Sequence, residues 1–213
     1  MKIIDELIER YPALEGEKDN IFKSFELLKN AFLDGKKLLI AGNGGSAADS
    51  NHIVGELMKS FELKRPIDDD IREKISNSDF YANELVNSLQ GALPTISLNN
   101  HESLNTAFLN DVNPTATFAQ QIMGYGVSGD VFLGISTSGN SKNVVMAAVV
   151  AKAKGLKVIG LTGERDSDLS KLADITIKAP DKITFKIQEY HLPIYHCLCR
   201  MLEQYFFGDK ELV

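Results

Sequence analysis

The chain has 213 residues, of which 44% are hydrophobic, and a formal net charge of −6. This length is enough for one α/β domain with a sizeable core. The negative charge argues against broad binding to nucleic acid or to an anionic membrane. No stretch reaches the roughly 20 apolar residues that a membrane span needs, and the acidic N-terminus lacks the apolar run of a signal peptide. We therefore expect a single-domain cytoplasmic protein.

Two amphipathic helices are predicted ahead of the first strand, within about residues 1–35. Apolar residues recur at helical spacing from Ile3 to Ile8, and this helix should stop near Pro12. A second, longer helix begins near Ile21 and ends at Gly35. Because a small sheet domain has little room for these apolar faces, we expect the two helices to pack against another subunit.

Strands and helices then alternate along the chain. The predicted strands are Lys37–Ala41, Thr95–Leu98, Val131–Ile135, Lys157–Leu161 and Ile175–Lys178. The predicted helices are Ala47–Phe61, Glu102–Leu109, Thr117–Tyr125, Lys142–Lys154 and Lys186–Phe207. This alternation predicts an α/β fold, a three-layer sandwich in which helices cover both faces of a parallel sheet. Ligands of such sheets bind beyond the carboxyl ends of the strands.

One segment, about residues 64–93, interrupts the alternation. It contains the run Asp68-Asp69-Asp70 and then apolar residues between Tyr81 and Leu89. We expect an exposed charged stretch followed by one extra amphipathic helix. About thirty residues rarely bury a core of their own, so the segment is interpreted as an insertion and not as a second domain.

The segment Gly42–Ser46 follows an apolar strand and precedes a helix. Glycines allow a sharp turn, and the free amides of the first helical turn favour an anion such as a phosphate. Gly42 to Ala47 also fits a loose dinucleotide fingerprint. That fingerprint requires an acidic residue after the next strand, where this chain has Asn99-Asn100, so a nucleotide site is disfavoured.

A second loop of the same kind is Ser136–Ser141, which carries four hydroxyl side chains and one glycine. Neutral donors of this kind can surround a phosphate without lysine or arginine. The alternative is an ordinary serine-rich turn that caps a helix. Because the loop lies between a buried strand and a helix, we favour a phosphate site. Two such loops in one small domain point to a phosphorylated small molecule.

Several histidines and carboxylates could carry chemistry. His52 and Glu56 lie four residues apart and therefore share one face of a helix. On one face they could bind a metal ion or transfer protons, and the alternative is an ordinary surface pair. Gln188 and His196 share a broad face of the last helix, where Glu189 and His191 also lie. We interpret His191 as peripheral or structural, and His101 as either a cap or a site residue. The only cysteines, Cys197 and Cys199, are interpreted as reduced core residues, which suits a reducing compartment.

Six motifs occur together and in a characteristic order. They are Gly42-Asn43-Gly44-Gly45-Ser46, His52-x-x-x-Glu56, Asn110-Asp111, Ser136-Thr137-Ser138-Gly139-Asn140-Ser141, Leu161-Thr162-Gly163 and Ile187-Gln188-Glu189-x-His191-x-x-x-x-His196. In this combination the chain resembles the sugar isomerase (SIS) domain of the phosphoheptose isomerase family. The resemblance covers nearly the whole chain except residues 64–93, so we expect one SIS domain over residues 1–213.

The resemblance implies a five-stranded parallel sheet in flavodoxin-like order, a homotetramer, and conversion of sedoheptulose 7-phosphate to D-glycero-D-manno-heptose 7-phosphate. The residues that it implies for phosphate binding are Ser136, Thr137, Ser138 and Ser141. Those that it implies for the rest of the substrate are Asn43, Gly44, Gly45, Ser46, Glu56, Asn110, Asp111 and Gln188. Glu56 and His196 would be the acid–base pair. The zinc ligands would be His52, Glu56, Gln188 and His196.

The chain departs from the family pattern after the glutamate, where an arginine is replaced within Lys59-Ser60-Phe61. A non-catalytic relative, which binds the replication initiator DnaA, is the main alternative. In that relative the glutamate and the last histidine are replaced. The presence of Glu56 and His196 therefore favours the enzyme. A sensor or an isomerase for another sugar phosphate is a third possibility.

Overall fold

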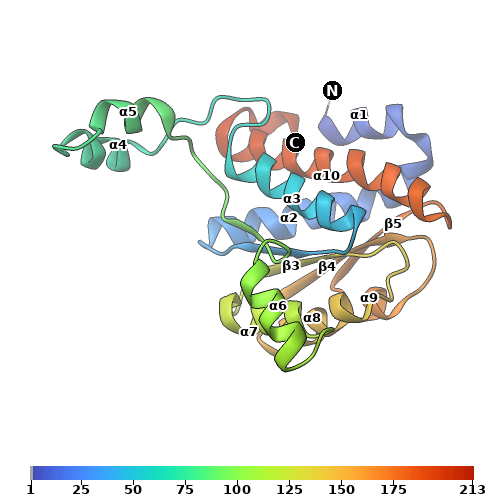
Figure 1. Cartoon of the computed structure of the whole chain (residues 1–213). Coiled ribbons are helices and arrows are strands. Elements are labelled where there is room, and N and C mark those ends of the chain that lie inside the picture. The colour runs from blue at the N-terminus through green and yellow to red at the C-terminus, as the bar shows by residue number, and fades with distance from the viewer. Residues whose placement is uncertain (1) are drawn as a thin grey trace.

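A computed structural model describes residues 2–213. Its centre is one sheet of five parallel strands in the order β2-β1-β3-β4-β5 (Figure 1). The strands are β1 (Leu38–Ala41), β2 (Thr95–Ser97), β3 (Val131–Ile135), β4 (Lys157–Gly163) and β5 (Ile175–Ala179). The change of direction in strand order falls between β1 and β3. The predicted flavodoxin-like sheet is thereby confirmed.

Helices cover both faces of the sheet, as predicted (Figure 1). One layer contains α1 (Ile3–Arg10), α2 (Lys18–Leu33), α3 (Gly45–Met58) and α10 (Thr184–Phe207). The opposite layer contains α6 (Glu102–Asp111), α7 (Thr117–Tyr125), α8 (Lys142–Ala153) and α9 (Asp168–Leu172). The sequence did not predict α9, nor the short 3-10 helices η1 (Pro12–Glu17) and η2 (Lys210–Leu212).

Strand β1 shows how the sheet divides the core. Leu38 and Ile40 belong to the hydrophobic cluster that includes α1, α2, α3 and α10. Leu39 and Ala41 belong to the cluster on the α7 and α8 side. Successive side chains of a strand point to opposite faces, so a continuously apolar strand must be buried on both. Leu39 lies level with Phe132 of β3, and both are fully buried.

The N-terminal helices pack their main apolar faces against the rest of the same chain. The sequence argument for a subunit interface assumed that these faces would have no partner within the chain. Ile3 and Leu7 of α1 and Phe25 of α2 are buried within the same chain. They belong to the cluster that also contains Met201 and Leu202 of α10. The sequence argument failed because it did not foresee that the long helix α10 would provide a second surface for these helices. The interface itself stays a prediction.

Residues 64–93 form two short helices and not one. These are α4 (Asp69–Ser76) and α5 (Ala82–Ser88), and we call this segment the α4–α5 arm. Figure 1 shows the arm standing away from the sheet. Neither helix contains a buried residue, and Phe80 and Tyr81 between them are 74% and 75% exposed. The internal structure of this segment therefore differs from the single helix expected, and its interpretation as an insertion stays a prediction.

A buried ion pair fixes the base of the arm to the domain. Arg65 donates its Nε–H to Glu203 of α10 at 2.8 Å, and both side chains are almost completely buried. The same guanidinium donates to the backbone carbonyls of Glu56 at 2.7 Å and Leu57 at 2.8 Å. Arg65 therefore holds the C-terminal end of α3, where helix carbonyls lack partners within the helix.

The cysteine prediction is confirmed, because Cys197 and Cys199 are buried thiols and form no disulfide. Burial raises the pKa of the Cys197 thiol to about 12, so it stays protonated at neutral pH. Within residues 2–213, no helix combines the length and the apolar character needed to cross a bilayer.

Candidate functional site

The glycine-rich loop connects β1 to α3, as predicted, and two of its glycines are required by geometry. Gly44 has a φ of +54°, a conformation that side chains with a Cβ rarely adopt. A Cβ on Gly45 would lie 2.5 Å from Nε2 of Gln188. Gln188 is therefore seated directly on the loop, although 143 residues separate the two positions. Ser46, in the first turn of α3, is buried.

Two asparagines that sequence reasoning missed hold this loop in place. Asn99, after β2, donates from Nδ2 to the carbonyl of Gly42 at 2.7 Å. Asn143, at the start of α8, exchanges two side-chain hydrogen bonds with Asn43, at 2.9 and 2.8 Å. The second pair links the glycine-rich loop to the helix that follows the serine-rich loop. The two loops are therefore held side by side beyond the carboxyl ends of β1 and β3. The only available signal was the position of these amides beside strand ends.

The serine-rich loop connects β3 to α8 and is internally organised. Ser136 and Ser141 share a hydrogen bond of 2.9 Å between their hydroxyls. Ser138 Oγ accepts from the amide of Asn140 at 3.2 Å. Gly139 has a φ of +66°, and a Cβ there would collide with the side chain of Ser167. The loop presents hydroxyls at the N-terminus of a twelve-residue helix, which is a suitable place for a phosphate.

His52 and Glu56 face each other on α3, with His52 Nε2 at 3.1 Å from Glu56 Oε1. The Glu56 side chain is only 12% exposed. Lys59 Nζ, in the segment where the chain departs from the family pattern, lies 3.9 Å from Glu56 Oε2. The expected shared face of the helix is confirmed.

His196 of α10 completes this group. Its ring meets that of His52 edge to face, with centroids 5.0 Å apart. Burial and the neighbouring His52 lower the pKa of His196, which favours the neutral imidazole. Two buried atoms here, His196 Nε2 and Glu56 Oε2, have no hydrogen-bond partner among the described residues. Unpartnered buried polar atoms are uncommon in folded proteins, and these two make the group around His52 a candidate binding site.

The chemistry of these donors suits a divalent metal, but the side chains are not arranged as a finished metal site. Imidazole nitrogens and a carboxylate are typical zinc donors. However, His52 Nε2 and Glu56 Oε1 point at each other. Over residues 2–213, no group of three or more His, Cys, Asp or Glu side chains is placed to hold a metal ion. The donors fit in kind, and rotation of the Glu56 and His52 side chains would be needed for them to share an ion.

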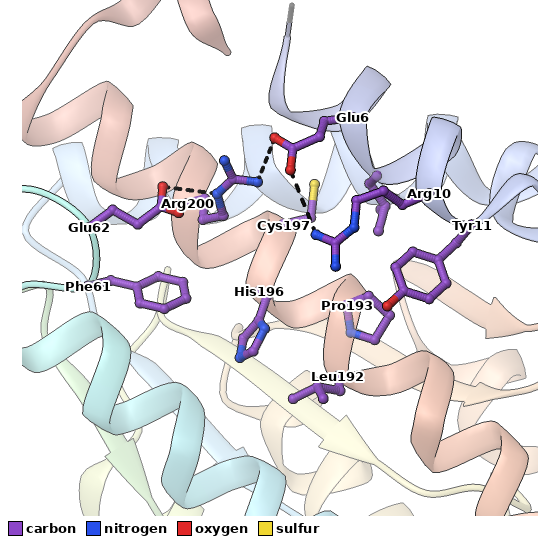
Figure 2. Close-up of a pocket in the computed structure, with 11 residues that line it drawn as sticks. Glu6, Arg10, Tyr11, Phe61, Glu62, Leu192, Pro193, His196, Cys197 and Arg200 are labelled. Atoms are coloured by element: carbon purple, nitrogen blue, oxygen red, sulfur yellow. Dashed lines mark hydrogen bonds and ion pairs between the residues drawn. The ribbon is translucent and has the colours of Figure 1, made fainter.

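Two cavities adjoin the candidate residues. The first, of about 260 Å³, lies between α1 and α10 and includes His196 and Phe61 (Figure 2). Its wall carries Arg200, whose guanidinium bridges Glu6 and Glu62 at 3.0 Å each. The second, of about 290 Å³, is lined by the serine-rich loop and by the start of α10. Sequence reasoning did not predict the charged residues of the first cavity, because its walls come from opposite ends of the chain.

Some predicted residues are not brought to this group. Asn110 and Asp111 are exposed at the end of α6 and are hydrogen-bonded to each other at 2.8 Å. His101 stacks near Tyr125, with centroids 5.3 Å apart. His191 is fully buried and shares a 3.2 Å hydrogen bond with the carbonyl of Thr162. Burial lowers the pKa of His191 to about 4, and of its two expected readings, peripheral or structural, the burial supports the structural one.

Comparison with protein families and with known proteins agrees with this arrangement. The family model described as the SIS domain matches residues 75–163. The chain is 37% identical to the phosphoheptose isomerase of Aneurinibacillus thermoaerophilus over 188 residues, which cover 88% of this chain and 80% of the relative. It is 39% identical to phosphoheptose isomerase 2 of Campylobacter jejuni over 185 residues, with coverages of 87% and 79%.

Solved structures give the same result. A phosphoheptose isomerase from Neisseria gonorrhoeae superposes with a TM-score of 0.74 at 27% identity, and covers 94% of both chains. A phosphoheptose isomerase from Francisella tularensis superposes with a TM-score of 0.73 at 26% identity, again over 94% of both chains. With the sheet order, the two loops and the level of identity in agreement, this chain belongs to the phosphoheptose isomerase family of SIS-domain proteins.

Proposed function

We propose that the protein is an aldose–ketose isomerase that converts sedoheptulose 7-phosphate to D-glycero-D-manno-heptose 7-phosphate. The observation that carries this proposal is the proximity of Glu56 and His196, each with a buried, unpartnered atom. The proposal is also supported by relatives named phosphoheptose isomerase, whose sequences are 37% and 39% identical to this chain.

The reaction requires a proton to move between neighbouring carbons through an enediol. In this proposal Glu56 takes the proton from one carbon and returns it to the next, because a carboxylate can serve as base and then as acid. His196, kept neutral by its environment, exchanges a proton with the substrate oxygens. The low exposure of Glu56 keeps water from competing for the transferred proton.

The remaining predicted residues bind the substrate. Hydroxyls of Ser136, Thr137, Ser138 and Ser141, with the free amides of α8, hold the phosphate. Asn43, Gly44, Gly45, Ser46 and Gln188 line the sugar's path from that phosphate to Glu56. Asn110 and Asp111 are retained as substrate contacts from the family resemblance. Their exposed position requires either movement of α6 or a site shared with another copy.

A zinc ion is proposed as cofactor, held by His52, Glu56, Gln188 and His196. When bound, such an ion polarises substrate oxygens and stabilises the charge of an enediolate. The support is the donor chemistry and the two unpartnered atoms. Elemental analysis of purified protein should find close to one zinc per chain. Loss of that zinc in His52→Ala, with no loss in His101→Ala, is expected, and zinc-free active protein would contradict the assignment.

We also propose a homotetramer in the cytoplasm, without a nucleic-acid or membrane partner. The buried, reduced cysteines and the net charge of −6 support this setting.

The proposed reaction is tested by incubating the purified chain with a panel of ketose phosphates and measuring the aldose products. We expect sedoheptulose 7-phosphate to be the best substrate. Faster turnover of a shorter ketose phosphate would show that the enzyme's substrate is a different sugar phosphate. Binding of sugar phosphates without turnover of any of them would favour the alternative, a non-catalytic SIS-domain binding protein or sensor.

A further inference from the structure

The loop that follows β4, residues 164–167, is fixed beside the serine-rich loop at both of its ends. On one side, the amide of Gly163 donates to the carbonyl of Thr137 at 3.0 Å. On the other side, the amide of Asp168 donates to Oδ1 of Asn140 at 3.0 Å. Because both flanking residues are bonded to the serine-rich loop, the residues between them are carried next to its hydroxyls.

Arg165 lies in this loop and contributes to the cavity that the serine-rich loop also lines. The cavity has a volume of about 290 Å³, and its wall includes Arg165, Thr137 and Ser138. A guanidinium carries five N–H donors in a planar fork that matches two oxygens of a phosphate. The cavity therefore combines neutral hydroxyl donors with a cationic donor.

The carboxylates around this cavity already have partners. Glu164 pairs with Lys182 at 3.1 Å, and Asp166 pairs with Lys178 at 2.6 Å. Asp181 accepts hydrogen bonds from two backbone amides, at 2.7 and 2.8 Å. Arg165, by contrast, forms no ion pair among residues 2–213, which leaves its charge available to an anionic ligand.

We propose that Arg165 is a further phosphate-binding residue, whose guanidinium binds the phosphate group of the substrate together with the hydroxyls of Thr137 and Ser138. The inference rests on the proposed function, since it adds a residue to the same phosphate site. The family resemblance implies only neutral side chains there. Hydrogen bonds between a cation and an anion are roughly twice as strong as neutral ones, so Arg165 would make the site select the phosphate ester over the neutral sugar.

A binding experiment tests this without turnover. Sedoheptitol 7-phosphate, obtained by reducing the carbonyl of sedoheptulose 7-phosphate, keeps the phosphate and cannot be isomerised. Its Kd is measured by isothermal titration calorimetry on the full-length wild type, Arg165→Gln and Arg165→Lys. Exposed ion pairs change affinity by up to about 5-fold, and hydrogen bonds to charged groups by about 10-fold or more. We expect Arg165→Gln to raise Kd by about 5- to 10-fold, and Arg165→Lys to raise it less, because lysine keeps the charge.

The matched control is Arg72→Gln, on α4 of the arm that stands away from the sheet (Figure 1). Arg72 also forms no ion pair among the described residues, and its replacement removes the same charge from the chain. At about 0.15 M salt, exposed charges more than roughly 8 Å apart are largely screened, so Arg72→Gln should keep the wild-type Kd. An equal Kd for wild type and Arg165→Gln, or an equal rise in Arg72→Gln, would overturn the proposal.

Steady-state kinetics separates this inference from the proposed reaction. With sedoheptulose 7-phosphate, Arg165→Gln should raise KM by a similar factor and keep kcat close to wild type, because Glu56 is unchanged. If the wild type isomerises no ketose phosphate but binds sedoheptitol 7-phosphate more tightly than Arg165→Gln does, the reaction fails and the phosphate contact stands. Turnover with the same KM in wild type and Arg165→Gln would overturn the contact and leave the reaction intact.

Discussion

Ser138 has an exposed hydroxyl at the N-terminus of α8, where a phosphate would accept its hydrogen bond. Hydrogen bonds to charged groups contribute about 1.5–3 kcal/mol, which corresponds to a roughly 10-fold or larger change in affinity. We expect Ser138→Ala to raise KM for a sugar phosphate by that factor. The exposed Ser103 of α6 provides the control, Ser103→Ala. Equal KM values for both variants in steady-state kinetics would remove Ser138 from the phosphate site.

Single residues also show where sequence reasoning reaches its limit. His52 and Glu56 could be paired from their spacing, because the helix period alone places them on one face. Asn143 could not be paired with Asn43, nor Tyr195 with His52, since these contacts join residues 100 and 143 positions apart. Such contacts depend on how helices sit on the sheet, which residue types do not reveal.

Among the elements, the base of the α4–α5 arm gives a test of stability. Burial alone would raise the pKa of Glu203, but the amides of Phe61 and Glu62 and the Arg65 guanidinium hold it below the usual value of 4.5. Removing one partner of a buried ion pair typically costs about 3–5 kcal/mol, because the other charge stays buried. We expect Glu203→Gln to lower the free energy of unfolding by that amount in urea titrations at fixed protein concentration.

The Arg65–Glu203 ion pair also predicts that the free energy of unfolding depends on pH. A carboxyl whose pKa is lowered in the folded state stabilises the fold above its unfolded pKa, and this contribution is lost as the pH falls through the folded value. The stability gap between wild type and Glu203→Gln should therefore narrow below about pH 4.5. As a control, substitution of the exposed Glu211 by Gln should leave the free energy of unfolding at neutral pH equal to that of wild type. A gap that is constant between neutral and acidic pH would show that Glu203 does not act through its charge.

At the level of elements, periodicity and glycine positions were sufficient for the sheet but not for the arm. The strands were predictable because each is a short apolar run followed by a turn or helix signal. The arm was predicted as one helix because Leu85 to Leu89 gave the clearest apolar repeat. The acidic α4 has few apolar residues and therefore little periodic signal, yet it forms beside α5.

For the whole molecule, the oligomeric state is the main untested prediction. The N-terminal helices bury most of their apolar residues internally, so any interface must use residues that stay exposed, such as Phe22 and Leu33. We expect light scattering to report about four times the chain mass of 23.5 kDa. A stable monomer at micromolar concentration would reject the homotetramer, and would leave exposed Asp111 without a neighbouring copy to complete its site.

The central claim is that Glu56 transfers the proton in sedoheptulose 7-phosphate isomerisation. The most direct measurement compares kcat for wild type, Glu56→Gln and the exposed control Glu189→Gln, each shown to be folded by circular dichroism. Acid–base catalysis of this kind contributes about 10²–10⁴ in rate, so Glu56→Gln should lose that factor while Glu189→Gln keeps wild-type turnover. Full turnover in Glu56→Gln would contradict the account.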